Sequence, residues 1–71
     1  MAHTINSEMT GTIAQVVTKV GAQVAAGDEL CILESMKMEI PILADAAGLV
    51  AEIHVSEGEA INQGAPVVTL E

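Results

Sequence analysis

The stretches GTIAQV, residues 11–16, and GLVAEI, residues 48–53, decide the fold of this chain, because the second repeats the first 37 residues later. The same offset relates Gly21 to Gly58 and Gly27 to Gly64, so all six glycines fall in register. Apolar residues also match at this offset, in the pairs Ile13/Val50, Val24/Ile61, Leu30/Val67 and Leu33/Leu70. We interpret the match as an internal duplication with halves of about residues 1–35 and 38–71, and we expect one domain over residues 1–71.

Short strand-forming runs alternate with glycine turns along each half, and no stretch shows helical periodicity with caps. The runs expected to form strands are residues 3–7, 12–19, 23–24, 29–34, 38–43, 49–55, 60–61 and 66–70. Pro41 and Pro66 lie near the starts of two of these runs and favour edge positions, because proline cannot donate to a strand ladder. Eight short strands in two equivalent halves predict an all-β fold of two small antiparallel sheets, related by a pseudo-twofold axis.

The composition restricts both the core and the partners. Hydrophobic residues make up 51% of the chain but none is aromatic, so the core is built from aliphatic side chains. Ten acidic residues, two lysines and no arginine give a net charge of −8, and we therefore expect neither nucleic acid nor an anionic membrane as a partner. A single cysteine, Cys31, excludes an internal disulfide and favours a cytoplasmic protein.

The segment Glu34-Ser35-Met36-Lys37-Met38-Glu39 lies where the two halves join. Because the chain reverses between equivalent halves, we expect Lys37 at an exposed hairpin tip. Met-Lys is not a typical pair for a hairpin turn, so this prediction depends on the repeat. An exposed lysine between two methionines suggests a site of covalent modification.

These residues resemble the attachment sequence of the biotinyl domain family, in which biotin forms an amide with the lysine of Met-Lys-Met. The resemblance extends over nearly the whole chain and implies a flattened barrel-sandwich of two four-stranded antiparallel sheets, with the modified lysine on a hairpin tip. It implies covalent biotin on Lys37, with Met36 and Met38 as flanking recognition residues and Glu34, Ser35 and Glu39 as weaker parts of the motif.

The function implied is that of a biotin carboxyl carrier, a non-catalytic swinging-arm domain that moves CO2 from a biotin carboxylase to a carboxyltransferase. A biotin protein ligase would attach the cofactor, and we expect the isolated domain to be a monomer. No insertion separates the halves, so the protruding loop of some bacterial carriers is expected to be absent.

Two other kinds of protein stay open. Glu34-Ser35 shortly before the lysine is closer to lipoyl domains, which favours lipoate and a 2-oxo acid dehydrogenase type of complex, or a domain that accepts either cofactor. The third hypothesis is a binding or structural module with no prosthetic group. An independent enzyme is the least supported, because no nucleophile, base and pocket can be assembled from these residues.

The remaining reactive side chains have simpler interpretations. Cys31 is flanked by apolar residues and His54 matches Val17 in the other half, so we expect both to serve packing. Cys31, His54 and His3 show no metal-ligand spacing, and Lys19 is expected to be an ordinary surface lysine.

Overall fold

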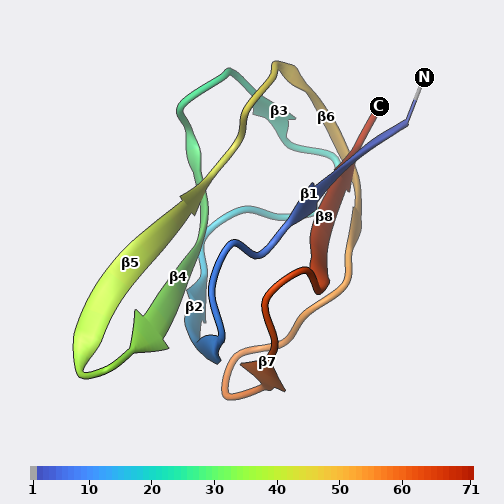
Figure 1. Cartoon of the computed structure of the whole chain (residues 1–71). Helices are drawn as coiled ribbons and strands as arrows, with labels where there is room; N and C mark the ends of the chain where they lie inside the picture. Colours follow the sequence, from blue (N-terminus) through green and yellow to red (C-terminus); the bar gives the residue numbers. More distant parts are fainter. Residues whose placement is uncertain (1) are drawn as a thin grey trace.

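The computed structural model describes residues 2–71, which form eight β-strands and no helix (Figure 1). The strands are β1 (His3–Asn6), β2 (Gly11–Val16), β3 (Gln23–Val24), β4 (Glu29–Ser35), β5 (Met38–Leu43), β6 (Gly48–Ile53), β7 (Ala60–Ile61) and β8 (Pro66–Leu70). All six strand pairings are antiparallel. No helix in this described range could cross a membrane.

The strands form two four-stranded sheets, with orders β1-β8-β6-β3 and β5-β4-β2-β7. This confirms the predicted all-β fold of two four-stranded antiparallel sheets. Exchanging each of the first four strands with its counterpart in the second half, β1 with β5 and so on to β4 with β8, converts one order into the other. The two central glycine-led strands, β2 and β6, also begin 37 residues apart. Each half therefore contributes two strands to each sheet, as a pseudo-twofold relation requires.

The core consists of aliphatic side chains held between the sheets, and repeat-equivalent residues occupy it together. Because both halves bury the same positions, the aliphatic layers from the two copies meet across the sandwich. Six equivalent pairs of apolar residues are buried: Ile5/Ile42, Ile13/Val50, Val24/Ile61, Leu30/Val67, Cys31/Val68 and Leu33/Leu70. The predicted packing role of Cys31 is confirmed, since its side chain is completely buried.

The two central strands end earlier than predicted. We expected strands over residues 12–19 and 49–55, whereas β2 ends at Val16 and β6 at Ile53. The N–H groups of Val17 and Thr18 both donate to the carbonyl of Leu30, at 2.9 and 3.1 Å, so the regular ladder of β2 stops there. The next residues, Val17 and Thr18, are still β-branched. Strand propensity alone does not extend a sheet, because each residue also needs a hydrogen-bond partner on a neighbouring strand.

The ends of the first and fourth strands also differ by one residue. β1 ends at Asn6 because the register with β8 shifts between Ile5 and Asn6, and β4 continues through Ser35, which pairs with Met38.

The prolines fit the fold differently from each other. Pro66 is the first residue of β8, as expected, whereas Pro41 lies inside β5 and is tolerated there because β5 is an edge strand.

Candidate functional site

The hairpin formed by β4 and β5 carries the candidate site. Ser35 pairs with Met38, so only Met36 and Lys37 form the loop. Both have positive φ, 54° for Met36 and 66° for Lys37, which is the pattern of a type I′ turn. This turn suits the twist of the flanking strands, but a left-handed conformation costs a residue with a Cβ roughly 1–2 kcal/mol. The predicted hairpin tip is thus present, and neither residue that forms it is one that local turn chemistry would select.

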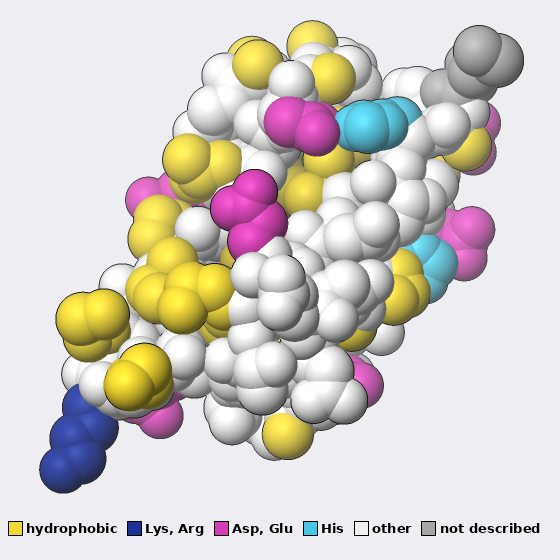
Figure 2. Space-filling view, viewed as in Figure 1, with side chains coloured by type: hydrophobic (Ala, Val, Ile, Leu, Met, Phe, Trp, Pro, Cys, Tyr) yellow, Lys and Arg dark blue, Asp and Glu magenta, His cyan; other side chains and the backbone are white. Residues whose placement is uncertain are grey.

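The side chains at this tip are exposed to solvent. Lys37 is exposed, the side chain of Met36 is 87% exposed and that of Met38 is 58% exposed. The Cα atoms extend over 33 × 17 × 17 Å, and Figure 2 shows a basic side chain at the end of the β4–β5 hairpin, at one end of this elongated shape. No carboxylate of residues 2–71 forms an ion pair with Lys37. Its amine is therefore free to meet another protein.

The base of the hairpin is held firmly against β2. A Cβ placed on Gly11 would lie 2.5 Å from the carbonyl oxygen of Glu34, so only glycine allows this close approach. Ser35 is buried, and its hydroxyl donates a hydrogen bond of 3.0 Å to the carbonyl of Thr10. The exposed tip consequently stands on a fixed base, which confines the region that the lysine side chain can search.

Two carboxylates flank the turn on the same hairpin. Glu34 and Glu39 are exposed and directly opposite each other in the β4–β5 pairing. Like charges directly opposite one another in a strand pair are destabilising. The hairpin thus combines two unfavourable features, the left-handed turn residues Met36 and Lys37 and the facing carboxylates Glu34 and Glu39. Neither feature improves packing, which suggests that these side chains serve contact with a partner.

The other reactive groups do not assemble into a catalytic centre. Burial raises the pKa of the Cys31 thiol from 9.0 to about 11, which suppresses the nucleophilic thiolate. The expected packing role of His54 is wrong, because its side chain is exposed, and its Nε2 lies 2.7 Å from the Thr69 hydroxyl. Residues 2–71 contain no group of three or more metal-ligating side chains close enough to hold a metal ion. Lys19 is exposed, as predicted.

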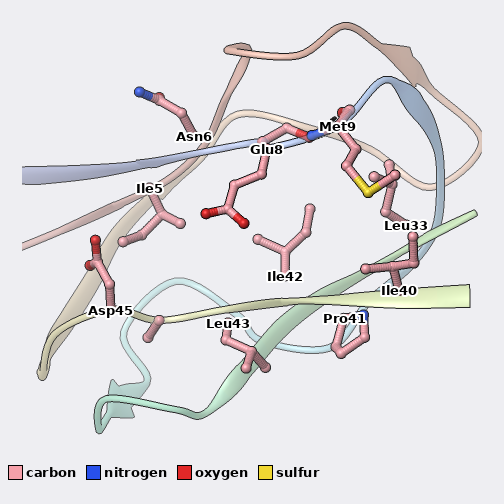
Figure 3. A pocket seen from close by; sticks show the side chains of 12 residues that line it. Ile5, Asn6, Glu8, Met9, Leu33, Ile40, Pro41, Ile42, Leu43 and Asp45 are labelled. Atoms are coloured by element: carbon pink, nitrogen blue, oxygen red, sulfur yellow. Dashed lines mark hydrogen bonds between the residues drawn. The ribbon is translucent and has the colours of Figure 1, made fainter. Parts of the chain in front are cut away.

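Sequence reasoning missed a second surface feature, a groove between β1 and β5 (Figure 3). It has a volume of about 360 Å³ and receives residues from both halves, among them the equivalent pairs Ile5/Ile42 and Glu8/Asp45. Figure 3 shows the Glu8 carboxylate directed into the space between Ile5 and Ile42. No motif marks these residues.

Comparison with known proteins places the hairpin in context. A sequence profile of the family described as "Biotin-requiring enzyme" matches residues 1–70. The biotin/lipoyl attachment protein of Bacillus subtilis is 48% identical over 61 residues, which cover 86% of this chain and 84% of that protein. The biotin carboxyl carrier protein of acetyl-CoA carboxylase from Haemophilus influenzae is 38% identical over 76 residues, covering 97% of this chain and 49% of that protein.

The fold is also similar to that of regions within solved carboxylase structures. The urea carboxylase of Kluyveromyces lactis contains a region that superimposes on the whole of this chain with a TM-score of 0.94 and 34% sequence identity. That region is only 6% of the urea carboxylase chain. This chain therefore corresponds to nearly all of a small attachment protein, to about half of a carrier protein and to a small part of a multidomain carboxylase.

Proposed function

This chain belongs to the biotin/lipoyl attachment family, and we propose that Lys37 is the residue on which it carries biotin. It is a biotin carboxyl carrier domain, a component that carries a group for a biotin-dependent carboxylase and does not itself catalyse a reaction. The observation that supports Lys37 most directly is its position: an exposed amine at the end of a two-residue turn, on a base fixed by Gly11 and Ser35.

Attachment would be an acyl transfer carried out by a biotin protein ligase. Lys37 would react as the neutral amine: its Nζ would form an amide bond with the biotin carboxyl group, which the ligase would activate with ATP. The ammonium nitrogen would lose one proton before the attack and a second as the amide forms, so the net charge of the chain would change from −8 to −9. Met36 and Met38 would contact the ligase, because their exposed, flexible thioethers suit an adaptable apolar contact.

The carrier role needs a long tether on a rigid base. When bound, biotin supplies the ring that accepts CO2 at a biotin carboxylase and gives it up at a carboxyltransferase. The protein supplies position: the lysine side chain gives length, and the two packed sheets keep its starting point fixed. Restricting the search in this way raises the effective concentration of the arm at each partner site. Cytoplasmic localisation and a monomeric state stay predictions.

Lipoate is the second candidate cofactor, because the family contains both kinds of domain. The segment Glu34-Ser35 pointed towards lipoate. Glu34 is exposed in the structure, whereas Ser35 is only 9% exposed and its hydroxyl donates a hydrogen bond to the carbonyl of Thr10. A buried, hydrogen-bonded serine is poorly placed to contact a ligase. We therefore attribute Ser35 to the structure of the hairpin base and not to recognition of the cofactor. Met36 and Met38 on either side of Lys37 then favour biotin.

Intact mass spectrometry of the protein from cells with active biotin and lipoate ligases, grown with both cofactors, tests the proposal. We expect a mass increase of one biotinyl group, its complete loss in Lys37→Arg, and no change in the matched control Lys19→Arg. An increase equal to a lipoyl group would identify a lipoyl carrier. An unmodified Lys37 under these conditions would overturn both carrier functions and leave a binding module without a prosthetic group.

A further inference from the structure

The groove between β1 and β5 is a feature of the surface that the attachment of biotin does not explain. It is lined by apolar side chains, including Ile5, Leu33 and Ile42, with Met9 and Leu43 partly exposed beside it. β1 and β5 are edge strands of the two sheets, and residues of both line the groove. No further strand of the described chain pairs with either of them on this side. Figure 2 shows hydrophobic side chains gathered over β5 between the tip lysine and an acidic side chain.

The charges of the groove have one sign. Glu8 and Asp45 are the only ionisable residues that line it, and both are carboxylic acids. One oxygen of Asp45 lies 2.7 Å from His3 Nε2, and this contact links β1 to the segment that follows β5. The Glu8 carboxylate points into the groove, and no side chain of residues 2–71 forms a hydrogen bond or ion pair with it. Because Glu8 is exposed, its carboxylate is available to a cationic group of another molecule.

The backbone around Glu8 is held by hydrogen bonds of the preceding residue, Ser7. The buried Ser7 hydroxyl donates to the carbonyl of Met9 at 2.6 Å and accepts from the Met9 N–H at 3.3 Å. The backbone of Ser7 is fixed as well, since its N–H donates to Ala65 and its carbonyl accepts from Gly64, both at 2.8 Å. Glu8 is therefore at the apex of a short turn whose backbone is held on both sides, and Figure 3 shows its carboxylate over the groove.

We propose that this groove docks an arginine side chain of the partner enzyme, with the guanidinium on Glu8 and the apolar stem against Ile5 and Ile42. The guanidinium is planar, carries paired N–H donors that match the two oxygens of a carboxylate, and is more weakly hydrated than an ammonium. Its three-methylene stem suits aliphatic walls. The net charge of −8 adds a long-range attraction to a basic face.

The position of the groove fits a docking role, and this part of the inference rests on the proposed carrier function. Ile40, which lines the groove, is three residues from Lys37 along β5, or about 10 Å at 3.3 Å per residue. A partner that holds the domain by this groove leaves the tip uncovered and keeps it close to its own surface. Docking here would orient the arm without blocking Lys37.

Titration of the unmodified ¹⁵N-labelled protein with the peptide acetyl-Leu-Arg-Leu-amide tests the inference by NMR. We expect saturable shifts of the amide signals of Glu8, Ile42 and Asp45, with a dissociation constant of roughly millimolar size, as befits a single side chain. The peptide with citrulline in place of arginine has nearly the same shape without the charge, and we expect it to bind at least about fivefold more weakly, since charge-assisted hydrogen bonds are about twice as strong as neutral ones.

Matched variants make the result specific to the groove. Glu8→Gln should reduce arginine-peptide binding to the level of the citrulline peptide, whereas Glu52→Gln, an exposed acid on β6, should leave it unchanged. Equal binding by wild type and Glu8→Gln, or shifts spread over all acidic residues, would overturn the proposal. Shifts at these residues that depend on protein concentration alone would also overturn it, in favour of a second copy of this chain. Because no biotin takes part, failure here leaves the carrier function standing, and an unmodified Lys37 leaves this titration unaffected.

Discussion

Six residues of the described chain have positive φ, and they fall into two groups. Four are the glycines Gly21, Gly27, Gly58 and Gly64, which turn the chain between strands in the body of the sandwich, with φ close to 90°. The other two are Met36 and Lys37, which turn it at the hairpin tip. Both groups lie at tight turns of the chain, but the first consists of glycines and the second of residues with long side chains.

The difference separates what the fold requires from what the function requires. In the body, glycine occupies the left-handed positions because it has no Cβ to strain, and the two halves keep these glycines in register. At the tip, the chain places large side chains in that same region of backbone conformation. Because Met36 is 87% exposed, it recovers little of the strain by packing. Such outliers cluster at functional sites, where the side chain matters more than the stability of the turn.

The largest expected effect concerns a glycine that serves close approach and has no positive φ. Gly11→Ala would place a Cβ 2.5 Å from the Glu34 carbonyl at the hairpin base, whereas its repeat equivalent, Gly48→Ala, would place one 3.1 Å from the Glu71 carbonyl. We expect Gly11→Ala to lower the free energy of unfolding by about 3 kcal/mol and Gly48→Ala by about 1 kcal/mol. Urea unfolding followed by far-ultraviolet circular dichroism measures both, since the chain has no Trp or Tyr for fluorescence. Equal losses would show that the hairpin base is no tighter than its counterpart.

The next effect tests the two groups of turns directly. Gly27→Ala has free space around its Cβ but a φ of 93°, so we expect it to destabilise the protein by roughly 1–2 kcal/mol. The double variant Met36→Asn/Lys37→Gly installs the pair that type I′ turns prefer, and we expect it to stabilise the protein by about 1 kcal/mol while removing the attachment site. Thermal unfolding of the two variants beside wild type gives both signs. A less stable double variant would mean that the native turn is not strained.

The smallest effect concerns charge at the tip. Glu39→Gln removes one of two carboxylates that face each other across β4 and β5. We expect the free energy of unfolding to rise by a few tenths of a kcal/mol at low salt, and the gain to shrink as salt screens the pair. The control is Glu52→Gln, an exposed acid on β6 that is not paired with another carboxylate. A similar gain in the control would attribute the effect to net charge and not to the pair.

The parts of the fold that follow from repetition could be predicted from the sequence. The glycine register identified the two halves, the number of strands and the position of Lys37 between them, because each is a property of spacing. Strand ends could not be predicted in the same way, since Val17 and Thr18 are good strand residues whose hydrogen bonds converge on one carbonyl. The groove could not be predicted from the sequence either. Glu8 and Ile42 are far apart in the sequence, and they come together only because edge strands of the two sheets line the same groove.

Pro41 in the edge strand β5 has a consequence for how this domain behaves at high concentration. An exposed edge of apolar residues is a template on which a second chain can add a strand, and β5 offers Met38 and Leu43, both substantially exposed. A proline in such an edge presents no N–H to an incoming strand, so the intermolecular ladder is interrupted in its middle. The same residue that breaks the regularity of β5 therefore protects the carrier against growth into aggregates, while leaving its apolar side chains available to partners.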